Sequence, residues 1–177
     1  HISNELGGNF ADGACHCEHC QNAFREWLRE KYGSLDRLNA AWWTSFWSHT
    51  YTDWNQIRSA SARGEDLVHG QKLDWKRFVD SRQLDFCKEE IRAVRSHSTL
   101  PVTANMMEFF YTFDYFKWAE ELDIISWDSY PDWHSGADEL RTASRTAAAH
   151  SLMRSLKKKT FLLMESTPSV VNWRQIN

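Results

Sequence analysis

The 177 residues are 42% hydrophobic and 25% charged, a composition typical of a globular chain with one hydrophobic core. The formal net charge is −3 and the two signs are interspersed, which argues against a nucleic-acid-binding surface. No apolar stretch reaches the roughly 20 residues that span a bilayer. Because no linker or low-complexity segment interrupts the sequence, we expect a single unit over residues 1–177.

The chain opens on a short apolar segment that runs into Asn4 and Glu5, which we interpret as the end of a strand. Residues 18–32 then carry apolar side chains at helical spacing, and Gly33 is placed to end that helix. Ser34 is placed to cap the N-terminus of a second helix. The first part of the chain is therefore predicted to be mainly helical.

The middle of the chain changes character twice. Residues 44–70 are polar and aromatic without a clear period, which predicts an irregular excursion. Residues 73–97 return to a helical pattern, with apolar side chains on two opposite sides. We expect this long helix to be buried on both sides.

Three later segments predict buried parallel strands, because residues 101–106, 123–127 and 160–164 are short and almost continuously apolar. Helices predicted over residues 113–122 and from about 137 to 158 separate these strands. Together with the opening segment, this alternation is typical of an α/β fold with a parallel sheet or barrel.

Polar residues stand at or directly after the end of each predicted strand. In parallel α/β folds, and in eight-stranded barrels above all, these ends form the active-site face. Four strands are half of such a barrel, and the chain is shorter than the ~200 to 250 residues of a complete one, so we expect a fragment. The polar residues are Asn4, Glu5, Asn105, Asp128, Ser129, Tyr130, Glu165, Ser166 and Thr167.

Glu5 and Glu165 are far apart in the sequence, but both face one cleft if they end neighbouring or facing strands. Two carboxylates in a cleft lined by aromatic side chains suit the cleavage of a glycosidic bond. The ten Trp residues favour this interpretation, because indole faces stack on sugar rings as well as packing cores. The alternative is that each glutamate is an exposed strand-end residue.

Two aromatic residues could assist such a pair. The hydroxyl of Tyr130 could hydrogen-bond a nucleophilic carboxylate, although Pro131 also suggests a simple tight turn. Trp173 follows Glu165 closely enough to form a stacking platform for a sugar, and its alternative is an ordinary core or surface position.

The segment CHCEHC carries Cys15, Cys17 and Cys20 directly before a predicted helix. This spacing favours a tetrahedral Zn²⁺ site, because cysteines so close together bridge poorly with one another. Three thiolates leave one ligand position, which His16, His19, Cys87 or a cysteine preceding residue 1 could fill.

Four stretches, spread over nearly the whole chain and in the same order, resemble the catalytic barrel of bacterial β-galactosidases of glycoside hydrolase family 42. The resemblance implies a (β/α)8 TIM barrel, of which this chain holds about strands four to seven, with a Cys-rich zinc-site insertion near residues 12–20. It also implies retaining release of terminal non-reducing β-D-galactose. The stretches are HISNELGG, CHCEHCQNAFREWLREKYGSLDRLNAAWWTSFWSHTYTDWNQI, FDYFKWAEELDIISWDSYPDW and HSLMRSLKKKTFLLMESTPSVVNW.

The resemblance also implies a role for each candidate residue. Glu5 matches the acid/base at the end of the fourth barrel strand, and Asn4 matches a hydrogen-bonding partner of the sugar. Glu165 matches the nucleophile at the end of the seventh strand. Tyr130 matches the tyrosine near that nucleophile, and Trp173 matches the tryptophan that lines the galactose pocket.

The three cysteines match three of the four zinc thiolates of many family members, with the fourth upstream, so the resemblance argues against Cys87 as a ligand. Expected partners are β-galactoside oligosaccharides and, for the full-length protein, two further copies in a homotrimer. The expected location is the cytoplasm.

The chain departs from the family pattern in two ways. Leu6 stands where many relatives carry Tyr, and barrel strands one to three and eight are missing from the chain.

Two alternatives remain open on the sequence alone. One is a related glycosidase that prefers β-fucosides or α-L-arabinopyranosides. The other is a noncatalytic, zinc-stabilised carbohydrate-binding or structural module, in which the two glutamates are incidental.

Overall fold

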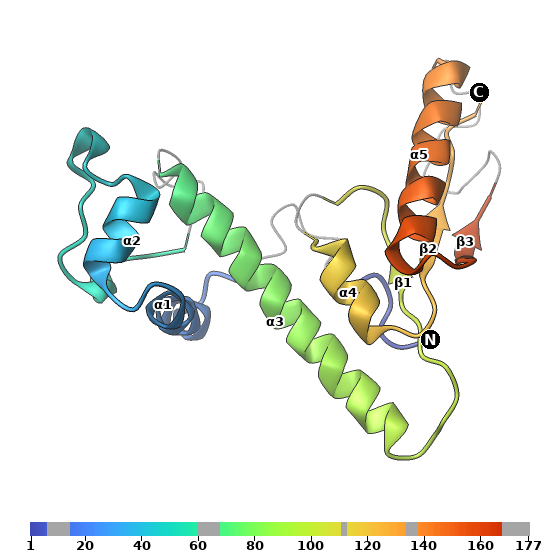
Figure 1. Ribbon diagram of the computed structural model, residues 1–177, viewed down its shortest axis with the longest axis horizontal. Coiled ribbons are helices and arrows are strands. Elements are labelled where there is room, and N and C mark those ends of the chain that lie inside the picture. The colour runs from blue at the N-terminus through green and yellow to red at the C-terminus, as the bar shows by residue number, and fades with distance from the viewer. Residues whose placement is uncertain (7–14, 60–67, 111–112, 134–137, 168–177) are drawn as a thin grey trace. The chain divides into compact units, whose positions relative to one another are not determined.

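The computed structural model describes residues 1–6, 15–59, 68–110, 113–133 and 138–167. The chain divides into two compact units, one formed by Phe10–Arg82 and the other by His1–Asn9 together with Gln83–Asn177. The division falls inside helix α3 (His69–Arg95), so it coincides with no break in secondary structure (Figure 1). That residues 1–177 belong to one catalytic domain stays a prediction.

The Phe10–Arg82 unit begins with the two predicted helices, α1 (Glu18–Tyr32) and α2 (Leu35–Trp42). Gly33 ends α1 with a φ of 72°, a left-handed value that glycine adopts without steric cost, and its N–H donates to the Arg29 carbonyl at 2.8 Å. The Ser34 hydroxyl accepts from the Arg37 N–H and caps α2. Both predicted caps are confirmed.

The core of this unit lies between α1, α2 and the first part of α3. Phe24, Leu28 and Leu38 are fully buried, and the ring of Trp75 meets that of Phe24 edge to face at 4.9 Å. Two short 3-10 helices, η1 (Phe46–Ser48) and η2 (Trp54–Gln56), lie in the stretch predicted to be irregular.

A buried carboxylate on α3 ties the three helices together. Asp74 is 1% exposed; it accepts hydrogen bonds from the Tyr32 hydroxyl at 2.5 Å and from the Trp42 indole N–H at 2.9 Å, and it pairs with Lys31. Burial alone would raise the pKa of Asp74, but the hydrogen bonds from Lys31, Tyr32 and Trp42 outweigh it and lower that pKa.

The second unit contains a three-stranded parallel sheet in the order β1-β2-β3 (Figure 1). Its strands are β1 (Asn105–Met106), β2 (Ser126–Ser129) and β3 (Leu162–Ser166). Helix α4 (Tyr115–Glu121) connects the first pair of strands, and α5 (Glu139–Lys157) connects the second and packs against β2. The predicted alternation of strands and helices after residue 100 is confirmed.

The strands begin later than the apolar pattern predicts. β2 and β3 start three and two residues further along than the predicted 123–127 and 160–164, so Asp128 and Glu165 lie inside strands. The prediction that they follow the strands is therefore wrong. The reason is the pairing between β2 and β3, which sets Asp128 opposite Glu165 and extends the sheet through polar residues.

The opening segment forms no strand within residues 1–6. A single backbone hydrogen bond, from the Ile2 N–H to the Thr103 carbonyl at 3.0 Å, nevertheless places it beside the chain that leads into β1. Ile2 is buried in the core of this unit. The segment thus occupies the position next to β1 where the prediction places a strand.

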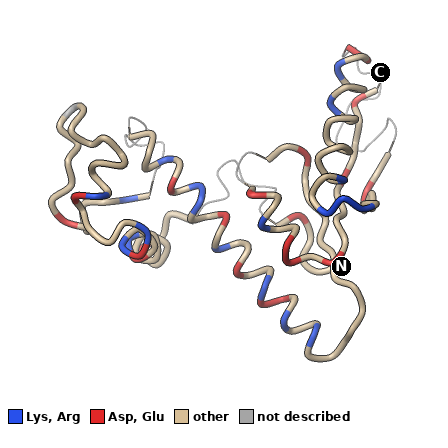
Figure 2. The backbone as a smooth tube through the Cα atoms, viewed as in Figure 1, with Lys and Arg blue, Asp and Glu red and all other residues tan. Residues whose placement is uncertain are grey.

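Helices α3 and α4 supply much of the core beneath this sheet. Cys87 and Ile91 of α3 pack with Trp118 of α4, and Trp127 of β2 belongs to the same buried cluster. Basic and acidic residues are interspersed along α3 (Figure 2). None of the helices in the described ranges is both long and apolar enough to cross a membrane.

Candidate active site

Three carboxylates converge at the end of the sheet where β2 and β3 finish. One carboxylate oxygen from each of Glu5, Asp128 and Glu165 lies within 4.8 Å of the other two. Asp128 is buried, and the two glutamates are half-buried. The structure therefore brings together the two glutamates that the sequence singled out, and adds an aspartate to which the sequence analysis gave no role.

The backbone at Glu5 is unusual. Glu5 follows Asn4 in a turn and has a φ of 45°, in the left-handed region that residues other than glycine rarely adopt. Its N–H donates to the side-chain oxygen of Asn105 at 3.0 Å. A strained residue of this kind persists only where surrounding contacts hold it, and such residues cluster at functional sites.

Asn105, at the start of β1, is 2% exposed and lies between the opening segment and β2. Its Nδ2 donates to Asn4 Oδ1 at 3.1 Å and to Asp128 Oδ2 at 2.6 Å. Its Oδ1 accepts from the Glu5 N–H and from His1 Nε2, the latter at 2.8 Å. The side-chain amide thus uses both of its hydrogens and both of its lone pairs.

Asp128 is 4% exposed, and in the described part of the chain its Oδ1 has no hydrogen-bond partner. Burial raises the pKa of Asp128 to about 6, against the hydrogen bond from Asn105 that lowers it. The nearby charges of Glu165 and Glu5 add to the increase. This carboxyl therefore titrates closer to neutral pH than an ordinary aspartate does.

Tyr130, just beyond β2, donates its hydroxyl hydrogen to Glu165 Oε2. This hydrogen bond is the main reason that the pKa of Tyr130 rises to about 12, and burial adds to it. The phenol therefore stays protonated, and remains a donor to Glu165, throughout the neutral range. Trp173 lies outside the described residues.

A cleft of about 440 Å³ opens beside Tyr130, between the end of β2 and the first turns of α5. Glu5 and Glu165 are not among its lining residues, so the cleft neighbours the carboxylates and does not contain them. It is lined by Glu108, Trp127, Ser129, Tyr130, Pro131, Asp132, Asp138, Arg141, Thr142, Arg145 and Thr146.

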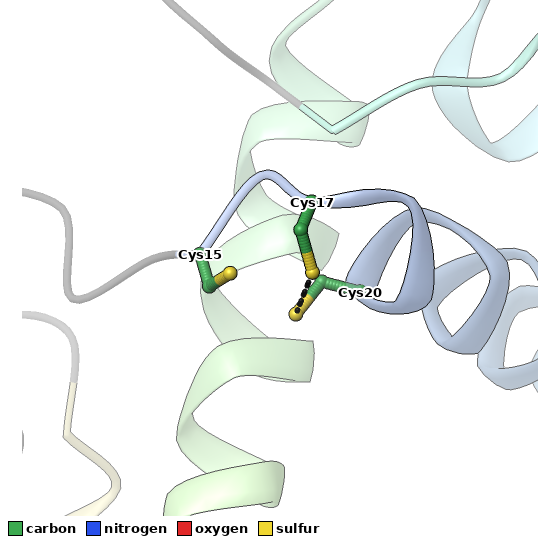
Figure 3. Close-up of side chains that lie close together, drawn as sticks. All are labelled: Cys15, Cys17 and Cys20. Carbon is green, nitrogen blue, oxygen red and sulfur yellow. Dashed lines mark hydrogen bonds between the residues drawn. The ribbon is translucent and has the colours of Figure 1, made fainter.

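The three cysteines of the other unit also converge, at the start of α1 (Figure 3). The sulfur atoms of Cys15, Cys17 and Cys20 lie within 4.8 Å of one another, and the Cys17 thiol donates to Cys20 Sγ at 3.7 Å. Hydrogen bonds, first from the Cys20 backbone and then from the neighbouring thiols, lower the pKa of Cys17 to about 7. Three convergent sulfur donors could hold a metal ion, and their chemistry suits Zn²⁺.

No fourth His, Cys, Asp or Glu within the described ranges joins this sulfur cluster. The ring of His16 hydrogen-bonds Ser59 Oγ through Nδ1 at 2.7 Å and stacks on Trp75. Cys87 is buried in the other unit, where burial raises the pKa of its thiol to about 11. The local candidates for a fourth ligand, His16 and His19, are thus not in position.

Known proteins match this chain over its whole length. The glycoside hydrolase family 42 model, described as beta-galactosidase, matches residues 1–177. Beta-galactosidase BglY of Alicyclobacillus acidocaldarius is 53% identical over 100% of this chain, and beta-galactosidase GanA of Bacillus subtilis is 47% identical over 100%. The chain covers 25% and 27% of those two relatives.

Solved structures agree with these sequence matches. The cold-adapted beta-galactosidase from Rahnella sp. R3 superposes with a TM-score of 0.91 at 53% identity, over 99% of this chain and 26% of that one. The E323A catalytic mutant of Gan42B, a family 42 beta-galactosidase from G. stearothermophilus, gives a TM-score of 0.89 at 49% identity, over 100% of this chain and 26% of that one. The parallel α/β unit is thus part of a TIM barrel, and the chain belongs to glycoside hydrolase family 42, the beta-galactosidase family.

Proposed function

We propose that this chain is the part of a retaining β-galactosidase that supplies both catalytic carboxylates, Glu165 as nucleophile and Glu5 as acid/base. The observation that carries the proposal is the approach of Glu5 and Glu165 oxygens to within 4.8 Å. Retaining glycosidases hold their two carboxyl groups roughly 5 to 5.5 Å apart, whereas inverting enzymes need roughly 6.5 to 9.5 Å to admit a water molecule. An oxygen-to-oxygen approach within 4.8 Å is compatible with the shorter separation, and the family resemblance adds the assignment to the retaining class.

In the first step, the carboxylate of Glu165 attacks the anomeric carbon of the galactosyl unit while the bond to the leaving oxygen breaks. Glu5 gives its proton to that oxygen, so the aglycone departs as a neutral alcohol. The hydrogen bond from the Tyr130 hydroxyl holds the Glu165 carboxylate in its orientation and helps to keep it ionised.

In the second step, Glu5 is a carboxylate and takes a proton from water as the water oxygen attacks the anomeric carbon. The bond to Glu165 breaks, and its electron pair returns to the carboxylate. Two inversions at one carbon release β-D-galactose and restore both glutamates to their starting protonation states.

Three further residues bind the sugar in this proposal. Asn4 stands beside Glu5 and, through its hydrogen bond from Asn105, is fixed in the same network. Tyr130 borders both Glu165 and the neighbouring cleft. Trp173 is proposed on the family resemblance as the stacking surface for galactose.

Proton NMR of the intact protein with an aryl β-D-galactoside tests the stereochemistry of the reaction. The first free sugar should be the β anomer, with the α anomer appearing later by mutarotation; α-galactose as the first product contradicts the proposal. The Glu165→Gln variant should release no sugar. Comparing kcat/KM with the matching β-D-fucoside and α-L-arabinopyranoside then ranks the preferred sugar.

We also propose that Cys15, Cys17 and Cys20 hold a structural Zn²⁺, with a fourth ligand from outside residues 1–177. Support comes from the three convergent sulfur atoms and from the family resemblance. Metal analysis of the intact protein should find about one zinc per chain, reduced strongly in Cys17→Ser and unchanged in Cys87→Ala, whose thiol lies in the other unit. Full zinc content in Cys17→Ser contradicts this site.

The proposed partners and location of the protein rest on the family resemblance. We propose β-galactoside oligosaccharides as substrates, a homotrimer as the assembly, and the cytoplasm as the location. Closely spaced cysteines that bind a metal ion and form no disulfide are typical of proteins kept in a reducing compartment. Light scattering of the intact protein checks the trimer through its mass.

A further inference from the structure

We propose that Asn105, anchored by Asp128, is a positioning residue for the reaction, because its side-chain amide fixes the conformation of Glu5 relative to Glu165. The inference rests on the proposed function, since it assigns a task to Asn105 only if Glu5 is the acid/base. Asn105 needs no contact with the substrate in this role.

The backbone at Glu5 is strained. A left-handed φ at a glutamate is unfavourable, so some contact must hold it there. The Glu5 N–H donates a hydrogen bond to Asn105 Oδ1, at 3.0 Å. The Nδ2 of the same amide holds the preceding side chain, Asn4. One buried side-chain amide thus hydrogen-bonds two successive residues of the turn.

Asn105 is itself held in place by Asp128. Asp128 accepts from Asn105 Nδ2 at 2.6 Å, which prevents the amide from rotating away from the turn. Asp128 lies on β2, directly opposite Glu165 on β3 in the strand register. The hydrogen bonds therefore form a continuous path from the backbone of Glu5, through Asn105 and Asp128, to the strand that carries Glu165.

This path of hydrogen bonds is buried. Asn105 and Asp128 are both almost fully buried, and a buried hydrogen bond between polar groups that water cannot replace is costly to break. The raised pKa of Asp128 agrees with a carboxyl retained in an unfavourable environment. A group kept there at the expense of stability suits a positioning task at a functional site.

The leaving group gives a readout that a purely structural residue would not change. In lactose the leaving group is a sugar alkoxide, which departs poorly unless the acid protonates its oxygen. The 2,4-dinitrophenolate ion is a good leaving group and departs without a proton. The value of kcat/KM reports the glycosylation step. Misplacing Glu5 should therefore lower kcat/KM for the hydrolysis of lactose far more than for that of the dinitrophenyl galactoside.

The test compares Asn105→Ala with Thr103→Ala in the intact protein. Thr103 is also buried two positions earlier, but its hydroxyl bonds the Ile124 carbonyl and Ser126 and touches none of the three carboxylates. Asn105→Ala should lower kcat/KM for lactose by about 30-fold and for the dinitrophenyl galactoside by less than ~3-fold. Thr103→Ala should change the two values by the same factor.

Asp128→Leu is a second variant in case Asn105→Ala does not fold. It removes a buried carboxyl whose charge is disfavoured by burial, and leaves the Asn105 amide hydrogen without its acceptor. It should show the same dependence on the leaving group, because Asn105 loses its anchor. Equal losses on both substrates, in either folded variant, overturn the inference while leaving the proposed function intact. An unmutated protein that hydrolyses neither galactoside overturns both.

Discussion

At the level of single residues, the hydrogen bond from Tyr130 to Glu165 predicts how a substitution of Tyr130 changes kcat. Because the pKa of Tyr130 is raised to about 12, its hydroxyl donates to Glu165 at any pH near neutrality. Tyr130→Phe should lower kcat by roughly 10- to 100-fold, the usual worth of a hydrogen bond to a charged group in a reacting centre. Steady-state kinetics of the intact protein measures this loss.

The matched control is Tyr115→Phe. The Tyr115 hydroxyl donates to the Met107 carbonyl at 2.6 Å and accepts from the Phe110 N–H, within the core of the same unit. This variant should lose stability and keep its kcat. A Tyr130→Phe enzyme with unchanged kcat would show that the hydroxyl has no part in catalysis.

Residue by residue, the sequence predicts the candidate site only in part. Glu5 and Glu165 could be predicted because each follows an apolar segment, and parallel strands bring such ends together. The hydrogen-bonding role of Asn105 could not, because it depends on contacts with residues about 100 positions away in the opening segment. Asp128 carries no local signal that its carboxyl is buried among other carboxylates.

At the scale of elements, Asp74 is the group that joins α1, α2 and α3. Asp74→Asn replaces one acceptor oxygen of the carboxylate by an NH2 group. Lys31, Tyr32 and Trp42 are all donors to Asp74, so the new NH2 group faces a donor in place of an acceptor. At pH 7 this should lower the free energy of unfolding of that unit by about 3 kcal/mol, as breaking a buried pair does. Urea unfolding of the intact protein, followed by tryptophan fluorescence, measures the change.

The effect should depend on pH in a definite direction. The folded-state pKa of Asp74 is lowered, so its ionised form contributes stability above the unfolded pKa of about 3.9 and loses that contribution as the pH falls through the folded value. The difference between Asp74→Asn and the unmutated protein should therefore shrink below about pH 4. A difference that stays constant down to pH 3 would argue against the charge as its source.

The predicted elements succeed where local chemistry marks an end. α1 begins and ends as predicted because Gly33 supplies the left-handed cap, and Ser34 marks the start of α2. The strands are offset because their limits depend on pairing between β2 and β3, which no local pattern reveals. α3 begins four residues before the predicted 73–97, since its first turn is polar.

At the scale of the molecule, the chain contains two units with different candidate chemistry. The sulfur cluster belongs to the Phe10–Arg82 unit, and the three carboxylates belong to the other. The division could not be predicted from composition, because it runs through the continuous helix α3. The chain spans about a quarter of the length of the relatives that it matches, so catalytic tests belong to the intact protein.

If Glu165 is the nucleophile, it forms a covalent bond with the sugar, and this intermediate can be trapped. The intact protein is treated with 2-deoxy-2-fluoro-β-D-galactosyl fluoride, digested, and analysed by mass spectrometry, with Glu165→Gln as control. We predict one fluorogalactosyl group per chain, on the peptide that contains Glu165, and none in the control. A label on the peptide that contains Glu5, or an active enzyme that acquires no label, would contradict the account.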